Sequence, residues 1–294
     1  MSITASLVKE LRERTNAGMM ECKKALVESN GDLEMAIEAL RKAGQAKAVK
    51  KASRTAGEGT IVVLAANDAK SAVLVEVNCE TDFVAREEKF MQFAKSAATI
   101  ALQNKLSVVE DLQKATDAAR LELVGQLGEN ITVRRIALHT VRDGVVGAYA
   151  HGDANGVRIG ALVVLKKGNV ESARDLAMQV AAMNPEYLTT AEIPQVRLDK
   201  EKEIYLAQTA DQLREEGKPL DKLEMIVAGK LKKFSKEVSL LGQPFVKDPN
   251  LTVEKWLKEV GAEVQSFVRF EVGEGIEKKE DNFVEEVMAQ VRGN

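Results

Sequence analysis

The chain has 294 residues, 45% of them hydrophobic, which is enough to bury one large core or roughly two to three smaller ones. Lysine and arginine total 42 against 45 acidic residues, and the net charge of -3 gives no global attraction to nucleic acid or to an anionic membrane. No apolar run reaches the roughly 18 residues that span a bilayer, and the amino terminus lacks a secretion signal. We therefore expect a cytoplasmic globular protein that recognises its partners locally.

The first 52 or so residues show helical periodicity and no strand signal. The pattern predicts three short helices, the first ending near residues 16–18 and the second near 30–31. Asp32 is positioned to cap the third helix, and Gly44 is positioned to end it. The basic segment that follows, GQAKAVKKASRTAGEG, is typical of a helical or flexible connector.

From residue 57 the periodicity changes to that of strands. Two β-rich runs joined by the turn at 66–70 precede a helical segment at 87–103, and the same order recurs over 143–185. Aligning Gly59 with Gly144 places the two units about 85 residues apart. We infer a duplicated unit and an α+β core of two similar subdomains.

A highly charged helical region follows, broken by Gly-Lys-Pro at 217–219, and this pattern predicts an antiparallel hairpin. Its charged face is either simply solvated or a surface for a partner or for self-association. A last strand within 262–275 would complete the second subdomain. The predicted units are 1–56 (three helices and connector), 57–141 (first core subdomain), 142–187 with 241–275 (second core subdomain), 188–240 (hairpin) and 276–294 (carboxy-terminal helical module).

Residues suited to catalysis or metal binding are scarce. Cys22 and Cys79 lie outside any Cys-x-x-Cys pattern, and we interpret both as buried thiols. Only His139 and His151 are available for acid–base or metal chemistry, and no complete phosphate-binding loop or dinucleotide fingerprint is present. The composition therefore argues against an enzyme, and we expect neither a metal nor a cofactor.

Three short stretches are candidates for function. The loop Ala17–Met20 places two methionines beside a glycine, where they either tuck into the helical core or form a docking surface edged by Arg12 and Lys23. At the end of a buried strand, one interpretation is that Asp82 caps the next helix and Phe83 fills the core. In the other, Phe83 faces outward as a wedge into a partner while Asp82 reorders that partner's hydrogen bonds. His151, in a turn of the second unit, is either locally bonded or a partner contact.

Several longer segments resemble one known family. In chain order they are ITASLVKELRERTNAGMMECKKALVESNGDLEMAIEALRK, EVNCETDFVA, GENITVRRIA, KKFSKEVSLLGQPFVKDP and RFEVGEGIEK. Over essentially the whole chain they resemble bacterial translation elongation factor Ts. The resemblance implies a ubiquitin-associated-like three-helix domain, a two-subdomain core, a coiled-coil hairpin and a helical carboxy-terminal module. It also implies the release of GDP from elongation factor Tu, so that GTP can bind.

The resemblance further implies which residues contact that partner. The element that enters the GTPase near its switch II region and dislodges Mg²⁺ would consist of Thr81, Asp82, Phe83 and Val84, with Asp82 and Phe83 carrying the insertion. The residues that dock elsewhere would be Arg12, Met19, Met20, Lys23, His151 and Val246. Direct contact with nucleic acid or a membrane is not expected, and the hairpin is a candidate for forming a homodimer or a 2:2 complex.

Two other functions stay open at the level of the sequence. The three-helix module could belong to an adaptor that binds a ubiquitin-like or helical ligand. The basic stretch KAVKKASR could instead contact RNA or the ribosome, although the near-neutral overall charge weakens that interpretation. An enzyme is the least favoured class, because two histidines and two scattered cysteines supply no nucleophile–base pair.

Overall fold

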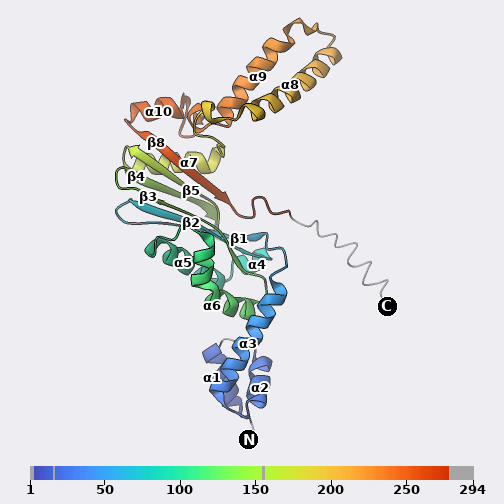
Figure 1. Cartoon of the computed structure of the whole chain (residues 1–294), viewed down its shortest axis with the longest axis vertical. Helices are drawn as coiled ribbons and strands as arrows, with labels where there is room; N and C mark the ends of the chain where they lie inside the picture. Colours follow the sequence, from blue (N-terminus) through green and yellow to red (C-terminus); the bar gives the residue numbers. More distant parts are fainter. Residues whose placement is uncertain (1–2, 16, 154–155, 278–294) are drawn as a thin grey trace.

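The computed structural model describes residues 3–15, 17–153 and 156–277. The molecule is elongated: helices from the amino terminus lie at one end, two β-sheets with their helices form the middle, and a helical hairpin projects from the other end (Figure 1). The coexistence of helices and sheets confirms the mixed α+β class. The predicted module at 276–294 lies outside the described residues, except for its first two positions.

The amino-terminal end contains α1 (Ala5–Thr15), α2 (Met19–Glu28) and α3 (Leu33–Lys51). Asp32 caps α3 as predicted, because its carboxylate accepts a hydrogen bond from the Met35 N–H at 2.9 Å. The buried core of this end consists of Leu11, Cys22, Ala25, Leu26 and Ala36. This core holds α1 and α2 against the first half of α3.

Helix α3 continues past Gly44, where the sequence predicted its end. It runs to Lys51, so the first half of the basic connector is helical. Gly44 lies opposite Gly125 of α6 (Val109–Leu127), because a Cβ added at Gly125 would lie 3.5 Å from the Gly44 Cα. The prediction was wrong because a single glycine inside a helical pattern lowers helix stability but does not by itself end the helix.

The first sheet has the strand order β1 (Glu58–Ala65), β2 (Ser71–Cys79) and β3 (Thr132–Thr140), all antiparallel. Helices α5 (Glu88–Gln103) and α6 cover one of its faces. The sequence predicted β1, β2 and α5, but it did not predict α6 or β3. Strand β3 was missed because its two adjacent arginines interrupt the alternation of apolar and polar residues typical of a strand. Most of its side chains are only half-buried, so the strand does not need a strictly alternating pattern.

The second sheet has the order β4 (Val145–Asp153), β5 (Gly156–Lys167) and β8 (Glu263–Glu271), again antiparallel. Helix α7 (Val170–Met183) packs on it. Strand β8 pairs with β5, as expected for the last strand predicted from the sequence. Each sheet therefore receives its third strand from a later part of the chain.

The two sheets have a glycine at the start of the first strand and a buried alanine on the covering helix at equivalent positions. Gly59 and Gly144 have positive φ angles of 143° and 92°. A Cβ at these glycines would lie 2.1 and 2.0 Å from a carbonyl oxygen of the neighbouring strand. Ala94 and Ala177 are both fully buried between helix and sheet. The two sheets therefore share a requirement for glycine at the strand start and for a small residue under the helix. The duplication inferred from the sequence stays a prediction.

The remaining faces of the two sheets pack against each other. The buried residues of this interface are Ile61, Ala72, Leu74, Val146, Leu162, Val164, Phe270 and Val272. Gly160 of β5 allows the closest approach, because an added Cβ would lie 2.8 Å from a methyl group of Ile61 and 2.9 Å from one of Leu74. The two subdomains therefore share one apolar interface.

A buried charge also joins the two sheets. Glu76 of β2 is fully buried and forms ion pairs with Arg134, at 3.2 Å, and with Arg135 of β3. Its carboxylate accepts a further hydrogen bond from the Gly273 N–H at 2.8 Å, just after β8. The Arg135 guanidinium lies 4.3 Å from the centre of the Phe270 ring. This cluster fastens the end of β8 to the first sheet.

Helices α8 (Gln195–Glu215) and α9 (Leu223–Glu237) form the predicted antiparallel hairpin (Figure 1). The Lys230 ammonium donates to the Thr209 hydroxyl at 2.9 Å and so bridges the two helices. The short elements that surround the hairpin are η1 (Thr190–Glu192), η2 (Leu220–Lys222), η3 (Leu240–Gly242), β6 (Pro244–Phe245), β7 (Asp248–Thr252) and α10 (Val253–Glu259).

Candidate functional site

Buried strand β2 ends directly before a single turn of helix, α4 (Asp82–Ala85). Thr81 is the residue that caps this turn, because its hydroxyl accepts a hydrogen bond from the Val84 N–H at 3.3 Å. The alternative in which Asp82 caps the helix is therefore wrong. Asp82 lies in the turn itself, where its exposed carboxylate pairs with Arg86 at 2.7 Å.

Helix α4 has one anchored side and one free side. Phe83 is 76% exposed, which confirms that its ring faces outward, whereas Val84 is only 9% exposed and packs into the core of the first subdomain. Val84 anchors the turn through this packing, and its predicted contact with a partner stays a prediction. The result is a large aromatic ring held on a short, well-supported element, which is the usual anatomy of an interface hot spot.

The turn before α4 is held by a residue to which the sequence assigned no role. The Glu129 carboxylate accepts hydrogen bonds from the N–H groups of Glu80 and Thr81, both at 3.0 Å, and from the Thr81 hydroxyl at 2.6 Å. Glu129 follows α6 and lies 48 residues from Thr81 in sequence. No local sequence signal could have identified it, because the contact is created by the fold.

Cys79 supports the same turn from within the core. Its thiol donates a hydrogen bond to the Thr81 carbonyl oxygen at 3.1 Å. Burial raises the pKa of Cys79 to about 12, and the nearby Glu129 carboxylate adds to this effect. The thiol is therefore protonated at neutral pH and acts as a hydrogen-bond donor, in line with its interpretation as a buried structural residue.

Met19 and Met20 lie in the first turn of α2 and not in a loop as the sequence suggested. They are 59% and 74% exposed, so the alternative in which both tuck into the helical core is wrong. Helix α2 instead turns Cys22 inward. Arg12 and Lys23 are also exposed, which leaves two methionines and two cations accessible at this end of the molecule.

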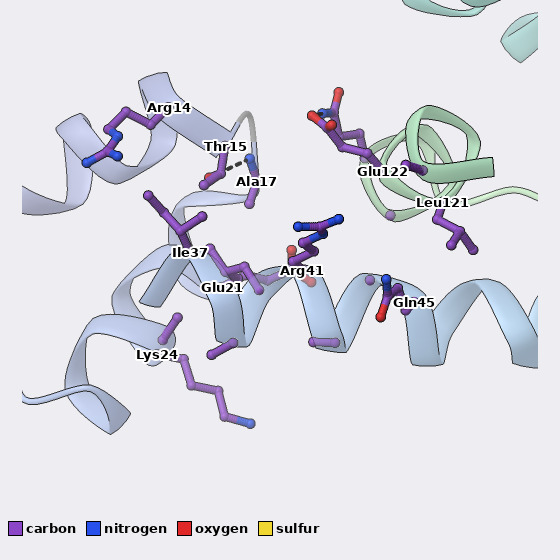
Figure 2. Close-up of a pocket in the computed structure, with 18 of the residues that line it drawn as sticks. Arg14, Thr15, Ala17, Glu21, Lys24, Ile37, Arg41, Gln45, Leu121 and Glu122 are labelled. Atoms are coloured by element: carbon purple, nitrogen blue, oxygen red, sulfur yellow. Dashed lines mark hydrogen bonds between the residues drawn. The ribbon is translucent and has the colours of Figure 1, made fainter. Parts of the chain in front are cut away.

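A cleft of about 600 Å³ separates this end from the core. Figure 2 shows Arg41 and Gln45 of α3 on its floor, Glu122 of α6 on one side and Ala17, before α2, on another. Side chains of both charge signs line it, and of the candidate residues only Ala17 is among them. The helices α1 and α2 thus meet the core mainly through α3, on which they are carried.

His151 lies in strand β4, whereas the sequence placed it in a turn. Its ring stacks on Tyr149, whose hydroxyl lies 3.5 Å from the His151 Nδ1. The adjoining part of β5 is fastened to the start of β1 by an ion pair between Arg158 and Glu58 at 2.9 Å. His151 lies opposite Ile159, next to Arg158, in the register of β4 and β5. Glu58 lies opposite Cys79, the last residue of β2 before the Phe83 turn. The structure therefore brings His151 and the Phe83 turn to the same end of the packed sheets.

Val246 lies elsewhere, between β6 and β7 in the second subdomain. Its side chain is 39% exposed, and its N–H donates a hydrogen bond to the buried Gln179 side chain of α7 at 2.7 Å. The neighbouring Lys247 forms an ion pair with Asp175. The structure therefore holds Val246 at the surface but does not bring it together with Phe83.

Within the described residues, no group of three or more histidine, cysteine, aspartate or glutamate side chains is arranged to hold a metal ion. None of the described helices combines the length and the apolar character required to cross a membrane.

Comparison with known proteins gives a single picture. Residues 80–274 match the family model described as "Elongation factor TS". The chain is 52% identical to elongation factor Ts of Legionella pneumophila (strain Lens), over 99% of both proteins. It is 51% identical to elongation factor Ts of Thioalkalivibrio sulfidiphilus, over 100% of both. It is also 52% identical to that of Saccharophagus degradans, over 99% of this chain and 98% of the relative.

Proposed function

The chain belongs to the elongation factor Ts family, and from this membership we propose that it is a guanine nucleotide exchange factor for elongation factor Tu in translation elongation. It binds the GDP-bound GTPase and releases GDP, so that GTP can bind. The observation that carries the proposal is the exposed Phe83 ring on the anchored turn α4. The factor itself carries out no covalent chemistry.

The insertion of Phe83 and Asp82 near switch II of the GTPase accounts for the loss of GDP. A bound nucleotide is held by a phosphate-binding loop and by a Mg²⁺ ion that bridges phosphate and protein. This ion is the largest local charge in such a site, so its displacement weakens the hold on the phosphates. Phe83 supplies the apolar wedge, and the Asp82 carboxylate competes for the polar groups of the partner.

Exchange requires more binding energy than one side chain supplies. The factor and the nucleotide weaken each other's binding by the same ratio, because the coupling between two sites is reciprocal. A coupling of about 1–3 kcal/mol changes affinity only by roughly 5- to 150-fold. We therefore assign further contacts to the exposed docking residues, which are Arg12, Met19, Met20, Lys23, His151 and Val246.

The test is catalytic exchange. Substoichiometric protein is added to elongation factor Tu loaded with a fluorescent GDP analogue, in the presence of excess GTP, and the release is followed by stopped flow. We expect many GDP molecules to be released per molecule of factor. Release that stops after one equivalent, or that proceeds at the spontaneous rate, would contradict the proposal. When Phe83→Ala is measured in the same assay, Val196→Ala is its matched control, because it alters an exposed apolar residue on the hairpin.

A further inference from the structure

The turn that presents Phe83 is held by the Glu129 carboxylate. One carboxylate oxygen accepts hydrogen bonds from the N–H groups of Glu80 and Thr81, and the other accepts the Thr81 hydroxyl. The distances are 3.0, 3.0 and 2.6 Å. Hydrogen bonds to a charged acceptor are stronger than those between neutral groups, so this contact is a firm one.

We propose that Glu129 is a positioning residue for nucleotide exchange, which acts on the partner only through Thr81 and Phe83. This proposal rests on the proposed function. Because the Thr81 hydroxyl donates to Glu129, its lone pair is directed to the Val84 N–H, and this second bond caps α4. An isolated single helical turn is not stable in water, so α4 depends on its cap and on its anchored side.

The same loop also holds the end of α3. The Asn130 side chain donates to the Arg54 carbonyl at 2.8 Å, and the Lys51 ammonium donates to the Gly128 carbonyl. In return, the Glu80 carboxylate accepts the Asn130 N–H at 2.6 Å. The loop 128–130 therefore fastens both the insertion turn and the end of α3, the helix against which α2 with Met19 and Met20 packs.

The charge and shape of Glu129 distinguish it from its nearest substitutes. Alanine removes all three acceptor contacts and leaves the N–H groups of Glu80 and Thr81 without a partner. Glutamine keeps one acceptor oxygen, but its amide group cannot accept the Thr81 hydroxyl. We therefore expect Glu129→Gln to fall between the wild type and Glu129→Ala.

The experiment separates positioning from binding. The maximal rate of GDP release at saturating factor and the half-saturating factor concentration are measured for both Glu129 variants. For Glu129→Ala we expect the maximal rate to fall about 10-fold while half-saturation stays within about twofold, since an interaction used only in the exchange step lowers the rate and not the affinity. Loss of folded protein alone would raise the apparent half-saturation and leave the maximal rate unchanged.

The double variant Glu129→Ala with Phe83→Ala supplies a stricter test. If Glu129 acts through Phe83, adding its substitution to Phe83→Ala should change the maximal rate by less than about twofold. Multiplicative effects would overturn the proposal, and so would a wild-type rate for Glu129→Ala. Glu192→Ala is the control, because Glu192 accepts a backbone N–H from Leu188 at 3.0 Å in a different loop.

The experiment still gives a clear answer if the Glu129→Ala variant does not fold or if the wild-type chain is inactive. If Glu129→Ala fails to fold, Thr81→Val removes only the capping hydroxyl and should reproduce the loss of maximal rate, and a wild-type rate in that variant would overturn the proposal. If the wild-type chain itself does not accelerate release, the proposed function fails and the role of Glu129 fails with it. Exchange by the wild type together with unchanged exchange by the Glu129 variants rejects only the present inference.

Discussion

At the scale of single residues, the presentation of Phe83 depends on the different environments of its neighbours. Val84 is buried in the subdomain core, and Thr81 is bonded to both Glu129 and the Val84 N–H. The ring itself has no such contacts to shield it and is 76% exposed. An apolar side chain kept in water on a rigid element gains much of its free energy on entering a partner, because the cost of ordering it is already met.

We expect Phe83→Ala to slow the factor-stimulated release of GDP about 30-fold, corresponding to the loss of about 2 kcal/mol typical of a hot spot. The affinity for nucleotide-free elongation factor Tu should change much less, because the ring acts during the displacement of GDP. Stopped-flow release and equilibrium titration measure the two quantities. A wild-type release rate would reject the role of Phe83 as a wedge.

Glu76 makes stability depend on pH. Its burial would raise the pKa of the carboxyl group, but the Gly273 N–H and the Arg135 guanidinium outweigh burial and hold the pKa below its usual value of 4.5. A lowered folded-state pKa adds stability that is fully present above about pH 4.5. This contribution disappears as the pH falls through the folded-state value.

We therefore expect Glu76→Gln to lower the free energy of unfolding at pH 7 by about 1.5–3 kcal/mol, the range for hydrogen bonds to charged groups. The difference from the wild type should shrink as the pH falls below 4.5. Urea unfolding over a pH series measures it. Glu274→Gln, which alters the more exposed partner of Arg135, should have a smaller effect. A pH-independent difference would contradict the assignment.

At the scale of elements, α3 connects the amino-terminal helices to the core of the molecule. Its first half carries α1 and α2, its middle crosses α6 at Gly44 and Gly125, and its end is tied to the loop at 128–130. A continuous helix is stiffer than the flexible connector considered from the sequence. It therefore fixes the orientation of α1 and α2 relative to the core more closely.

Gly44→Ala should stabilise the protein by about 0.5–1 kcal/mol, because alanine is the better helix former. An added Cβ at Gly44 would meet no atom within 4 Å. Gly217→Ala is the control, since Gly217 has a φ angle of 63° and alanine is strained there. Chemical denaturation followed by circular dichroism measures both variants. A loss of stability in Gly44→Ala would show that the close crossing of α3 and α6 does not tolerate the methyl group.

The start of α2 is expected to contribute affinity more than rate. Replacing Met19 and Met20 together with alanine should weaken binding to nucleotide-free elongation factor Tu about 10-fold, because two exposed thioether side chains lose their contact area. The maximal rate of GDP release should change little. Met225→Ala is a matched control, since Met225 is also exposed but lies on the hairpin. An unchanged affinity in titrations would reject the docking role.

At the scale of the whole molecule, the two sheets share an apolar interface and are joined by the Glu76 cluster. Joint burial couples their stabilities, since opening either sheet exposes the apolar face of the other. This coupling bears on the proposed exchange, in which Phe83 of the first sheet's subdomain and His151 of β4 are predicted to contact the partner together.

Gly160→Ala tests this coupling, because the added methyl group would press on Ile61 and Leu74 across the interface. We expect a loss of about 1–3 kcal/mol, as for other overpacked cores. In a Cys22→Ala background, Cys79 reactivity reports on the first subdomain, and the fluorescence of the single tryptophan, Trp256, reports on the second. Both transitions should shift together. Separate transitions would show that the subdomains unfold independently, and Gly229→Ala provides a control in open space.

Features that depend on local periodicity and on chain geometry could be predicted from the amino-acid sequence alone. Asp32 as a cap, the two strand pairs with their glycine starts and the antiparallel hairpin all follow from spacing between near neighbours. The family was also recognisable, because its segments occur in order along the chain. The predicted unit boundaries and the self-association of the hairpin stay predictions.

Features that depend on contacts between distant residues became visible in the folded chain and not in the sequence. Glu129 reaches Thr81 across 48 positions, Gly44 meets Gly125 on another helix, and β3 joins its sheet although its arginines disguise it. Whether an aromatic at a strand end is buried or exposed is likewise set by what the fold places beside it. Phe83 remains exposed because the turn buries the neighbouring Val84 and turns the ring to solvent, and burial of this kind is a property of the assembled core.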